Sequence, residues 1–289
     1  MTRQFPPDTQ YTRDYLLFHS ENRVVKHTNV KSFNVFENMH RNLLIWDFLP
    51  KTKDGLYLDL GCGRAPNTIA LALDGRKVIG ADLDPKELGP AKQWVKASKL
   101  EKYATLQREN MNKLTFQSNM FDYIVCIEAL EHTEDMRVAG AEISRVLKNN
   151  GTAIISLPNS TSIMWKLIHL FKHLRLYSCP NIEYGREFHH EIPLRHIYKL
   201  MSDLNLEVTE MHSLNILPLP MVYNFLPNFL TPLILRFSYW WRKFDALLGR
   251  TPLIKIFGSS VILKCRKINA NSKNEKINKE NEKRSEKNA

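Results

Sequence analysis

The ten residues 57–66 constrain the fold of this chain more than any other stretch. An apolar run carries the acid Asp59, and Gly61 and Gly63 follow one residue apart. Glycine permits a tight turn and a close approach of the backbone to a ligand. Pro66 suits the first turn of a helix, where its missing N–H would have no partner anyway. The pattern predicts a strand, a glycine loop and a helix, a unit that presents N–H groups to a nucleotide-like ligand.

Further apolar runs alternate with helical patterns along the rest of the chain. Strands are predicted at 77–82, 104–108, 121–127, 152–157, 206–211 and 253–264, and helices at 68–73, 134–147 and 193–204. Strands and helices that alternate at this spacing predict an α/β fold, with a mostly parallel sheet covered by helices on both faces.

The glycine loop also indicates which kind of nucleotide is bound. A dinucleotide fingerprint would need a third glycine where this chain has Pro66, which weakens a nicotinamide reading. An acid followed by Gly-x-Gly instead resembles motif I of the class I S-adenosylmethionine (SAM) methyltransferases, and the strand beginning Phe121-Asp122 matches the same family. The resemblance covers about residues 55–212 and the last strand. It implies a Rossmann-like, doubly wound sheet of seven strands with an antiparallel last strand, plus a helical cap or insert.

The resemblance implies a set of SAM-binding residues beyond the ends of the first four strands. Asp59 would lie near the methionine end of the cofactor. Asp82, which ends the second strand, can accept hydrogen bonds from both ribose hydroxyls, and Asn110 would accept from the adenine amino group. The full predicted set is Asp59, Gly61, Cys62, Gly63, Asp82, Leu83, Asn110, Met111 and Glu128.

Glu128, Glu131 and His132 follow the fourth predicted strand. If residues 128–132 take one helical turn, the three side chains share one face, just beyond the strand ends where ligands bind in open α/β sheets. Glu-x-x-Glu-His resembles both the ubiquinone-pathway O-methyltransferases and the enzymes that methylate the terminal ribose of small RNAs. In the second group these side chains and a later histidine hold a divalent metal. The candidates for that later position are His189 and His190, of which His189 fits the pattern slightly better.

Two chemical roles are open for this group. Two carboxylates and two imidazoles (Glu128, Glu131, His132 and His189) would suit Mg²⁺, Mn²⁺, Fe²⁺ or Zn²⁺ with positions free for substrate. The metal would then lower the pKa of a bound hydroxyl. Alternatively Glu131 and His132 form an ion pair without metal, and His132 is the general base. In both cases we predict His132 and Glu131 as the catalytic residues.

The charge and the apolar segments outside the motifs indicate which kinds of partner or substrate the chain could bind. The net charge is +11, which favours anionic partners. Residues 161–177 predict an amphipathic helix with a basic face. Residues 214–250 are very apolar but are interrupted by four prolines, so one membrane-spanning helix is not expected. The two segments could cap a greasy substrate pocket, contact a membrane surface, or bury against the core.

We divide the chain into an N-terminal arm and helix (1–50, helical over 33–49), a SAM-dependent methyltransferase domain (51–265) and a disordered basic tail (266–289). Four widely spaced cysteines and a polar first segment predict reduced thiols, no secretory signal and a cytoplasmic protein, with possible peripheral contact to a membrane.

The predicted reaction is SAM-dependent O-methylation of a hydroxyl on a lipophilic or membrane-associated small molecule, such as a quinol-type ring or a lipid-linked sugar. RNA ribose methylation is the alternative enzyme. Nucleic acid is less favoured as a partner, because the aromatic residues crowd into apolar runs instead of alternating with basic ones. A non-catalytic, SAM-binding partner subunit is the alternative of another class. Neither the acceptor nor the oligomeric state follows from the sequence.

Overall fold

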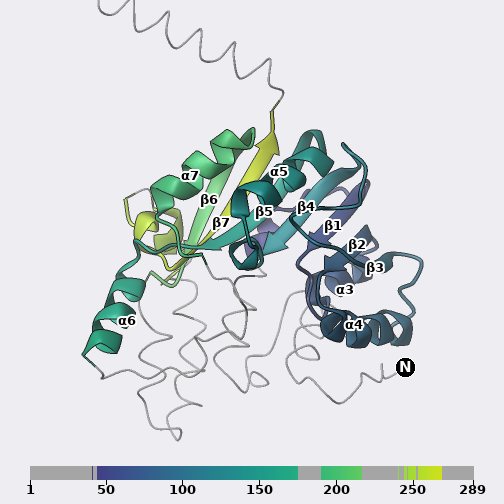
Figure 1. Cartoon of the computed structure of the whole chain (residues 1–289), viewed down its shortest axis with the longest axis horizontal. Helices are drawn as coiled ribbons and strands as arrows, with labels where there is room; N and C mark the ends of the chain where they lie inside the picture. Colours follow the sequence, from purple (N-terminus) through teal and green to yellow (C-terminus); the bar gives the residue numbers. More distant parts are fainter. Residues whose placement is uncertain are drawn as a thin grey trace, which may run out of the picture.

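The computed structural model describes residues 41, 44–174, 190–216, 240, 244–245, 247–251 and 253–268 (Figure 1). The helix predicted at 33–49 is helical over 44–48. The remaining part of that prediction lies outside the described residues, as do His189, the centre of the apolar insert and most of the tail.

Seven strands in the described residues form one sheet. They are β1 (Leu56–Leu60), β2 (Lys77–Asp82), β3 (Ala104–Arg108), β4 (Phe121–Ile127), β5 (Leu147–Pro158), β6 (Leu206–Leu214) and β7 (Ser260–Lys267). The helices are α3 (Pro66–Leu73), α4 (Pro85–Ala97), α5 (Met136–Val146), α6 (Ile163–His173) and α7 (Leu194–Asp203), with short 3₁₀ helices η2 (Leu130–His132) and η4 (Lys255–Phe257).

The strand order is β3-β2-β1-β4-β5-β7-β6. Strands β1 to β5 pair in parallel, and β7 is antiparallel to both of its neighbours, β5 and β6. The predicted doubly wound, mostly parallel sheet of seven strands with an antiparallel last strand is therefore confirmed. Consecutive strands run outward from β1 in one direction and then from β4 in the other, so the order reverses between β1 and β4.

The last strand was predicted to begin too early. Four of the five residues 253–257 are apolar, yet Leu253 is 82% exposed and η4 occupies the positions just before Gly258. The strand starts at Ser260 and continues to Lys267, two residues beyond the predicted end of the domain at 265. An apolar run by itself did not distinguish a buried strand from an exposed turn of helix.

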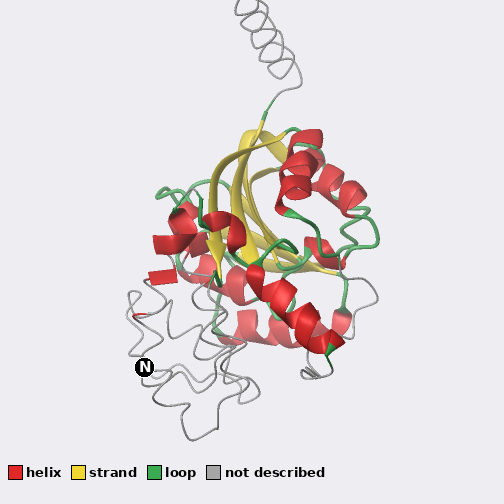
Figure 2. Ribbon diagram, turned by 90° about the vertical axis from the view of Figure 1, so that its left-hand side faces the viewer, coloured by secondary structure: helices red, strands yellow, loops and turns green. Residues whose placement is uncertain are grey.

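Helices lie on both sides of the sheet (Figure 2), and each face of the sheet packs into its own apolar core. Leu58 of β1 belongs to the core formed with α5 and α7, whereas the adjacent Tyr57 belongs to the core formed with residues 44–49 and α3. Successive side chains of a strand point to opposite faces, so β1 serves both cores. Helices on both faces are what a parallel sheet requires, because both of its faces are apolar.

Three of the four cysteines, Cys62, Cys126 and Cys265, are buried with free thiols, and Cys179 lies outside the described residues. Within the described ranges, no helix combines the length and hydropathy needed to cross a bilayer.

Residues 244–245 and 247–251 dock on the end of β6. The carboxylate of Asp245 accepts hydrogen bonds from the backbone N–H groups of Asn215 (2.9 Å) and Ile216 (3.0 Å). A Cβ added to Gly249 would lie 2.1 Å from the carbonyl oxygen of Ser213. Because that neighbour is backbone, it cannot move aside without disturbing β6.

We predict opposite effects for alanine at two helical glycines. Gly249→Ala should lower the free energy of unfolding by about 1–3 kcal/mol, because the added methyl group overlaps the β6 backbone. Gly89→Ala in α4, where no described atom lies within 4 Å of the new Cβ, should raise it by about 0.5–1 kcal/mol through helix propensity alone. Urea unfolding measures both. Equal effects of the two changes would show that the segment does not pack on β6 as described.

Candidate active site

The glycine loop folds back onto the end of β2. The N–H groups of Gly61 and Cys62 both donate to the carbonyl oxygen of Ala81, at 2.8 and 3.0 Å. Gly61 (φ 74°) and Gly63 (φ 52°) have left-handed backbones. A Cβ on Gly61 would lie 2.3 Å from the Cβ of Ala129, whereas Gly63 has no described atom within 4 Å of its hypothetical Cβ. The first glycine therefore permits close packing, and the second leaves open space beside the loop.

Asp82 joins this loop to the end of β2. Its Oδ2 accepts from the N–H of Gly63 at 2.7 Å, and its Oδ1 accepts from the N–H of Asp84 at 2.9 Å. A carboxylate oxygen has a second lone pair, so both oxygens can still accept from a ligand. The next side chain, Leu83, is 54% exposed and provides an apolar surface beside the acid. The structure thus brings together the glycine loop and the acid that the sequence placed at the ends of two separate strands.

Asp59 is positioned differently from the other predicted SAM residues. It is 2% exposed, and its Oδ2 accepts from both the N–H (2.8 Å) and the hydroxyl (2.6 Å) of Thr68 in α3. Burial raises the pKa of Asp59 to about 6, and the hydrogen bonds from Thr68 offset only part of that rise. In this structure Asp59 links the end of β1 to α3, and its contact with SAM stays a prediction.

The loop after β3 reaches the glycine loop. The side-chain oxygen of Asn110 accepts from the N–H of Asn112 at 2.9 Å, so it closes its own turn, and the adenine role remains a prediction. The methyl carbon of Met111 lies 3.5 Å from the position that a Cβ on Gly61 would occupy. Buried Glu109, which the sequence did not single out, holds this loop by accepting from the N–H of Thr115 at 2.9 Å.

The predicted helical turn over residues 128–132 is wrong. Glu128 has a left-handed backbone (φ 49°), and the 3₁₀ turn η2 begins only at Leu130. Oε1 of Glu128 accepts from the hydroxyls of Ser156 (2.9 Å) and Ser260 (2.8 Å), and it lies 3.8 Å from Nε of Arg41. A non-glycine residue at positive φ is strained and is retained where its surroundings fix it.

These partners determine the charge of Glu128. Burial alone would raise its pKa, but the Arg41 guanidinium, the two serine hydroxyls and His132 outweigh burial and hold the pKa below its usual range. Glu128 is therefore ionised at neutral pH. It stands at the end of β4, beside the reversal of strand order, where open α/β sheets bind their ligands.

Glu131 and His132 form a second polar unit in η2. Glu131 is 1% exposed, and its Oε1 lies 3.8 Å from Nε2 of His132. The turn is held by His190, whose N–H donates to the Glu131 carbonyl (2.9 Å) and whose ring lies 2.9 Å from the Thr133 carbonyl. Among the described residues, no group of three or more potential ligands is arranged to hold a metal ion. The four-residue metal prediction therefore gains no support, and its fourth member, His189, is outside the described ranges.

Several contributors to the site could not be found from the sequence. Thr68 is an ordinary polar residue within a helical pattern. Ser260 lies 132 positions from Glu128 and approaches it only because β7 inserts next to β5. His190 was a candidate for the later metal-binding histidine, and in the structure it contacts the backbone carbonyls of Glu131 and Thr133.

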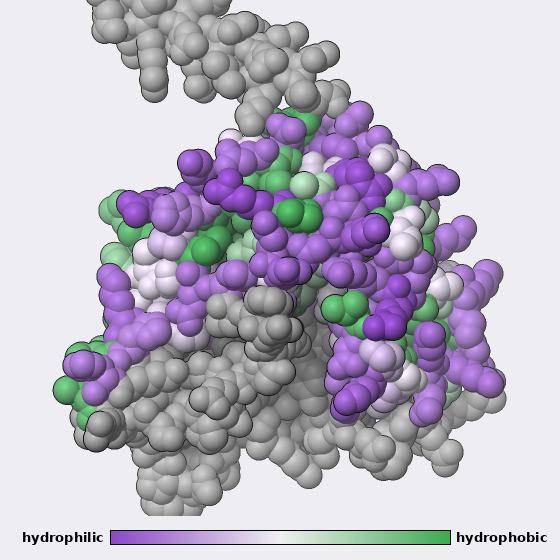
Figure 3. All heavy atoms as spheres, in the orientation of Figure 1, coloured by the Kyte–Doolittle hydropathy of each residue, from purple (hydrophilic) through white to green (hydrophobic). Residues whose placement is uncertain are grey.

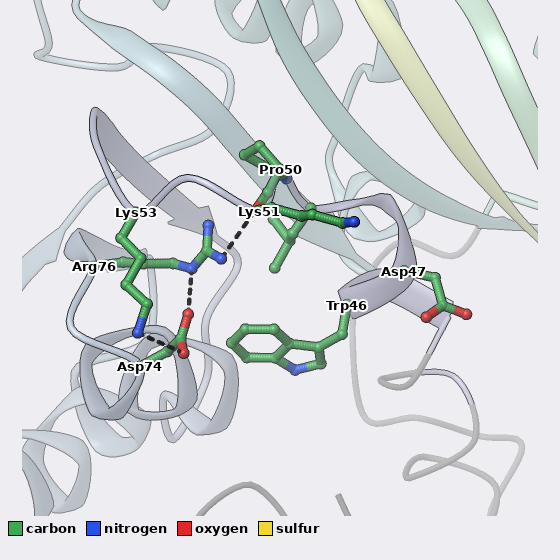
Figure 4. Close-up of a pocket in the computed structure, with 8 residues that line it drawn as sticks. Trp46, Asp47, Pro50, Lys51, Lys53, Asp74 and Arg76 are labelled. Atoms are coloured by element: carbon green, nitrogen blue, oxygen red, sulfur yellow. Dashed lines mark hydrogen bonds and ion pairs between the residues drawn. The ribbon is translucent and has the colours of Figure 1, made fainter. Parts of the chain in front are cut away.

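A cavity of about 320 Å³ lies at the opposite edge of the sheet (Figure 4). It is lined by residues that precede β1 and β2, including Trp46, Lys53, Asp74 and Arg76. Arg76 is 4% exposed and donates to Asp74 (2.8 Å) and to the Pro50 carbonyl (3.0 Å). These bonds fasten the chain before β1 to the end of α3. Since ligands of such sheets bind at the carboxyl ends of strands, this cavity is not the candidate active site.

A reversal of strand order, with a glycine loop on one side and an acid at the end of the next strand, is the arrangement of nucleotide-binding α/β domains. The antiparallel β7 between β5 and β6 fits the SAM-dependent, class I methyltransferase type of such a domain. The comparisons with known proteins agree. Residues 58–155 match the family model described as a methyltransferase domain, and we assign that domain to these residues.

Among curated relatives, the ubiquinone biosynthesis O-methyltransferase of Actinobacillus pleuropneumoniae serotype 7 is 28% identical over 134 residues, which cover 44% of this chain and 57% of that protein. The enzyme of the same name from Methylococcus capsulatus is 34% identical over 103 residues, covering 35% and 43%. The chain thus spans about half the length of the curated relatives it matches. A geranyl diphosphate methyltransferase solved with SAM shares the fold, with a TM-score of 0.54 and 17% identity over 91% of this chain and 93% of that one.

From the raised pKa of Asp59 we predict how the free energy of unfolding changes with pH. An acid whose pKa is raised on folding, here from 3.8 to about 6, stabilises the folded state below the lower value, and that stabilisation is lost as the pH rises through the higher one. Asp59→Asn keeps an oxygen for Thr68 but does not titrate. Between pH 4 and pH 7 the stability of the wild type should therefore fall by about 2–3 kcal/mol relative to the variant. Urea unfolding at each pH measures this difference, and a constant difference would contradict the burial of an ionisable Asp59.

We predict that replacing Asp82 weakens SAM binding and that replacing the nearby Asp84 does not. Asp82→Asn removes the charge that strengthens hydrogen bonds from ribose hydroxyls and should weaken SAM binding about 10- to 100-fold by calorimetry. Asp84→Asn is the matched control, because asparagine also caps α4 and the same charge is removed two residues away. Equal weakening by the two variants would contradict a direct role for Asp82.

Proposed function

We propose that this protein transfers the methyl group of SAM to a hydroxyl oxygen of a lipophilic acceptor. The observation that carries the proposal is the contact of Asp82 with the Gly63 N–H, which builds a cradle at the same sheet edge as Glu131 and His132. The methyltransferase domain supports the donor, and the acid–base pair supports an acceptor that must lose a proton.

The described residues fit SAM as the donor. Asp82 would accept from the ribose hydroxyls, Leu83 and Met111 would contact the adenine, and the open side of Gly63 leaves room for the backbone to approach the cofactor. Bound SAM supplies an electrophilic methyl group on a sulfonium that is already a good leaving group. The protein therefore has to position the acceptor oxygen and remove its proton.

His132 is the proposed general base. Its Nε2 lies 3.8 Å from Oε1 of buried Glu131, so the imidazolium formed by taking a proton is stabilised by the carboxylate. His190 fixes the turn that carries both residues through two backbone carbonyls. Glu128 lies beside the pair and is ionised, so it can accept a hydrogen bond from a second hydroxyl of the acceptor. Ser156, Ser260 and Arg41 all surround Oε1 of Glu128, so the acceptor hydroxyl would bind at Oε2, and we do not assign metal ligation to this residue.

The lipophilic acceptor rests on weaker support than the donor. The curated relatives are named for ubiquinone biosynthesis, and the solved neighbour is named for geranyl diphosphate. Both names denote molecules with an apolar chain. A quinol-type ring and a lipid-linked sugar both offer the hydroxyl that the Glu131–His132 pair would deprotonate. RNA ribose methylation shares that chemistry, but no contact of the described residues favours it.

We predict that His132→Gln lowers methyl transfer about 100- to 10,000-fold while SAM affinity stays unchanged, because only proton removal is lost. His196→Gln on the exposed side of α7 is the matched control and should leave the rate unchanged. Transfer of isotope-labelled methyl groups to catechol and quinol acceptors with graded apolar chains measures the rates, and calorimetry measures SAM binding.

Each remaining hypothesis has a distinct outcome in this experiment. An unchanged rate in His132→Gln would remove His132 as the base. Undetectable SAM binding by the wild type would leave only a non-catalytic subunit. Labelling of RNA but of no small acceptor would favour ribose methylation, and a rate abolished by chelator would reopen the metal hypothesis.

A further inference from the structure

Exposed large apolar side chains are concentrated in two segments of the described chain. Twelve such side chains are exposed among the described residues, and nine of them lie in residues 163–174 or 240–257. They are Ile163, Leu170, Leu174, Trp240, Phe244, Leu247, Leu253, Ile256 and Phe257. Single exposed apolar residues are ordinary, but a concentration of this kind indicates an interaction surface.

Hydrogen bonds connect the start of α6, and Asn159 before it, to residues 256–259. Buried Asn159, at the end of β5, donates from its side chain to the carbonyl oxygens of Ile256 and Gly258, both at 2.9 Å. The indole N–H of Trp165 in α6 donates to the Ser259 carbonyl at 3.3 Å. The start of α6 and the end of η4 are therefore adjacent. We call the exposed apolar side chains of residues 163–174 and of the described part of 240–257 the α6–η4 face. In Figures 1 and 3, α6 extends at the lower left, where hydrophobic and hydrophilic side chains lie next to one another.

The charges of this face have one sign. The stretch 163–174 contains no acidic residue, and 240–257 contains only Asp245, which is buried against the end of β6. The described cations are Lys166, Arg250 and Lys255, with His169 able to join them. His169 and Arg250 lie near carboxylates of Glu191 (3.3 Å) and Asp47 (3.4 Å), whereas Lys166 and Lys255 have no described carboxylate within ion-pair distance.

The face borders the candidate active site. Ser260, which donates to Glu128, follows Gly258 by two residues. Because β7 is antiparallel, its start lies at the same sheet edge as the ends of β4 and β5. A partner bound to the α6–η4 face would therefore lie at the same sheet edge as Glu128.

We propose that the α6–η4 face docks on an anionic lipid bilayer. Large apolar side chains with lysine and arginine between them suit the boundary between headgroups and acyl chains, where apolar burial and attraction to anionic lipid add together. A second copy of this chain fits less well, because a two-fold contact would place the same cations against each other without acidic partners. Docking would present the active site to acceptors dissolved in the membrane.

The test is co-sedimentation of the full-length protein with vesicles. We expect binding to vesicles of phosphatidylcholine with one-third phosphatidylglycerol, and binding at least about tenfold weaker to phosphatidylcholine alone or in high salt. Leu170→Asp combined with Leu253→Asp should weaken binding at least about tenfold, because both side chains would enter the bilayer. Val138→Asp on α5 is 45% exposed in the wild type and is the matched control for an added charge outside the face.

Three results would overturn the proposal. The protein could fail to bind either vesicle, or the double variant could bind like the wild type. Light scattering could instead show a dimer that the double variant dissociates, which would assign the face to a second copy. Calorimetry with SAM on the same variants should give wild-type affinity, so a failure of membrane docking is separable from a failure of the proposed activity.

Discussion

The site depends on how the loop after β1 is fixed to the end of β2. Two N–H groups of this loop share the Ala81 carbonyl, and a third donates to Asp82. This arrangement sets the direction in which α3 leaves the loop and holds the acid beside open space. It also brings Gly61 against Ala129, so the chain after β4 must turn where the glycine allows. One set of backbone hydrogen bonds thereby positions the ends of three strands.

Two neighbouring carboxylates show how environment separates their roles. Asp59 is buried and accepts hydrogen bonds from Thr68, and its pKa rises to about 6. Glu128 is only partly buried and has a guanidinium and two hydroxyls around it, and its pKa falls. A group that tends toward neutrality suits a structural link between β1 and α3. A fixed negative charge suits the recognition of a hydroxyl or cation on a ligand.

The sequence predicted the features that are set by neighbouring residues and missed those that are set by contacts between distant parts of the chain. The glycines after β1 and the acid at the end of β2 are signals within a few residues, and both were placed correctly. The turn at Glu128 was predicted as helical, because glutamate is not a residue type that indicates a positive φ. Ser156, Ser260 and Arg41 reach Glu128 from three separate parts of the chain, and their approach follows from sheet order. The start of β7 was misjudged because exposed and buried apolar runs share one composition.

The antiparallel last strand has a consequence for synthesis of the protein. Of the described strands, β7 is the last to leave the ribosome, and it pairs on one side with β5 and on the other with β6. Until it emerges, the nascent polypeptide holds two unpaired edges that can associate with other chains. The serine that completes the polar group around Glu128 arrives on that same strand. A product truncated before residue 260 would therefore lack part of its site and be prone to aggregation.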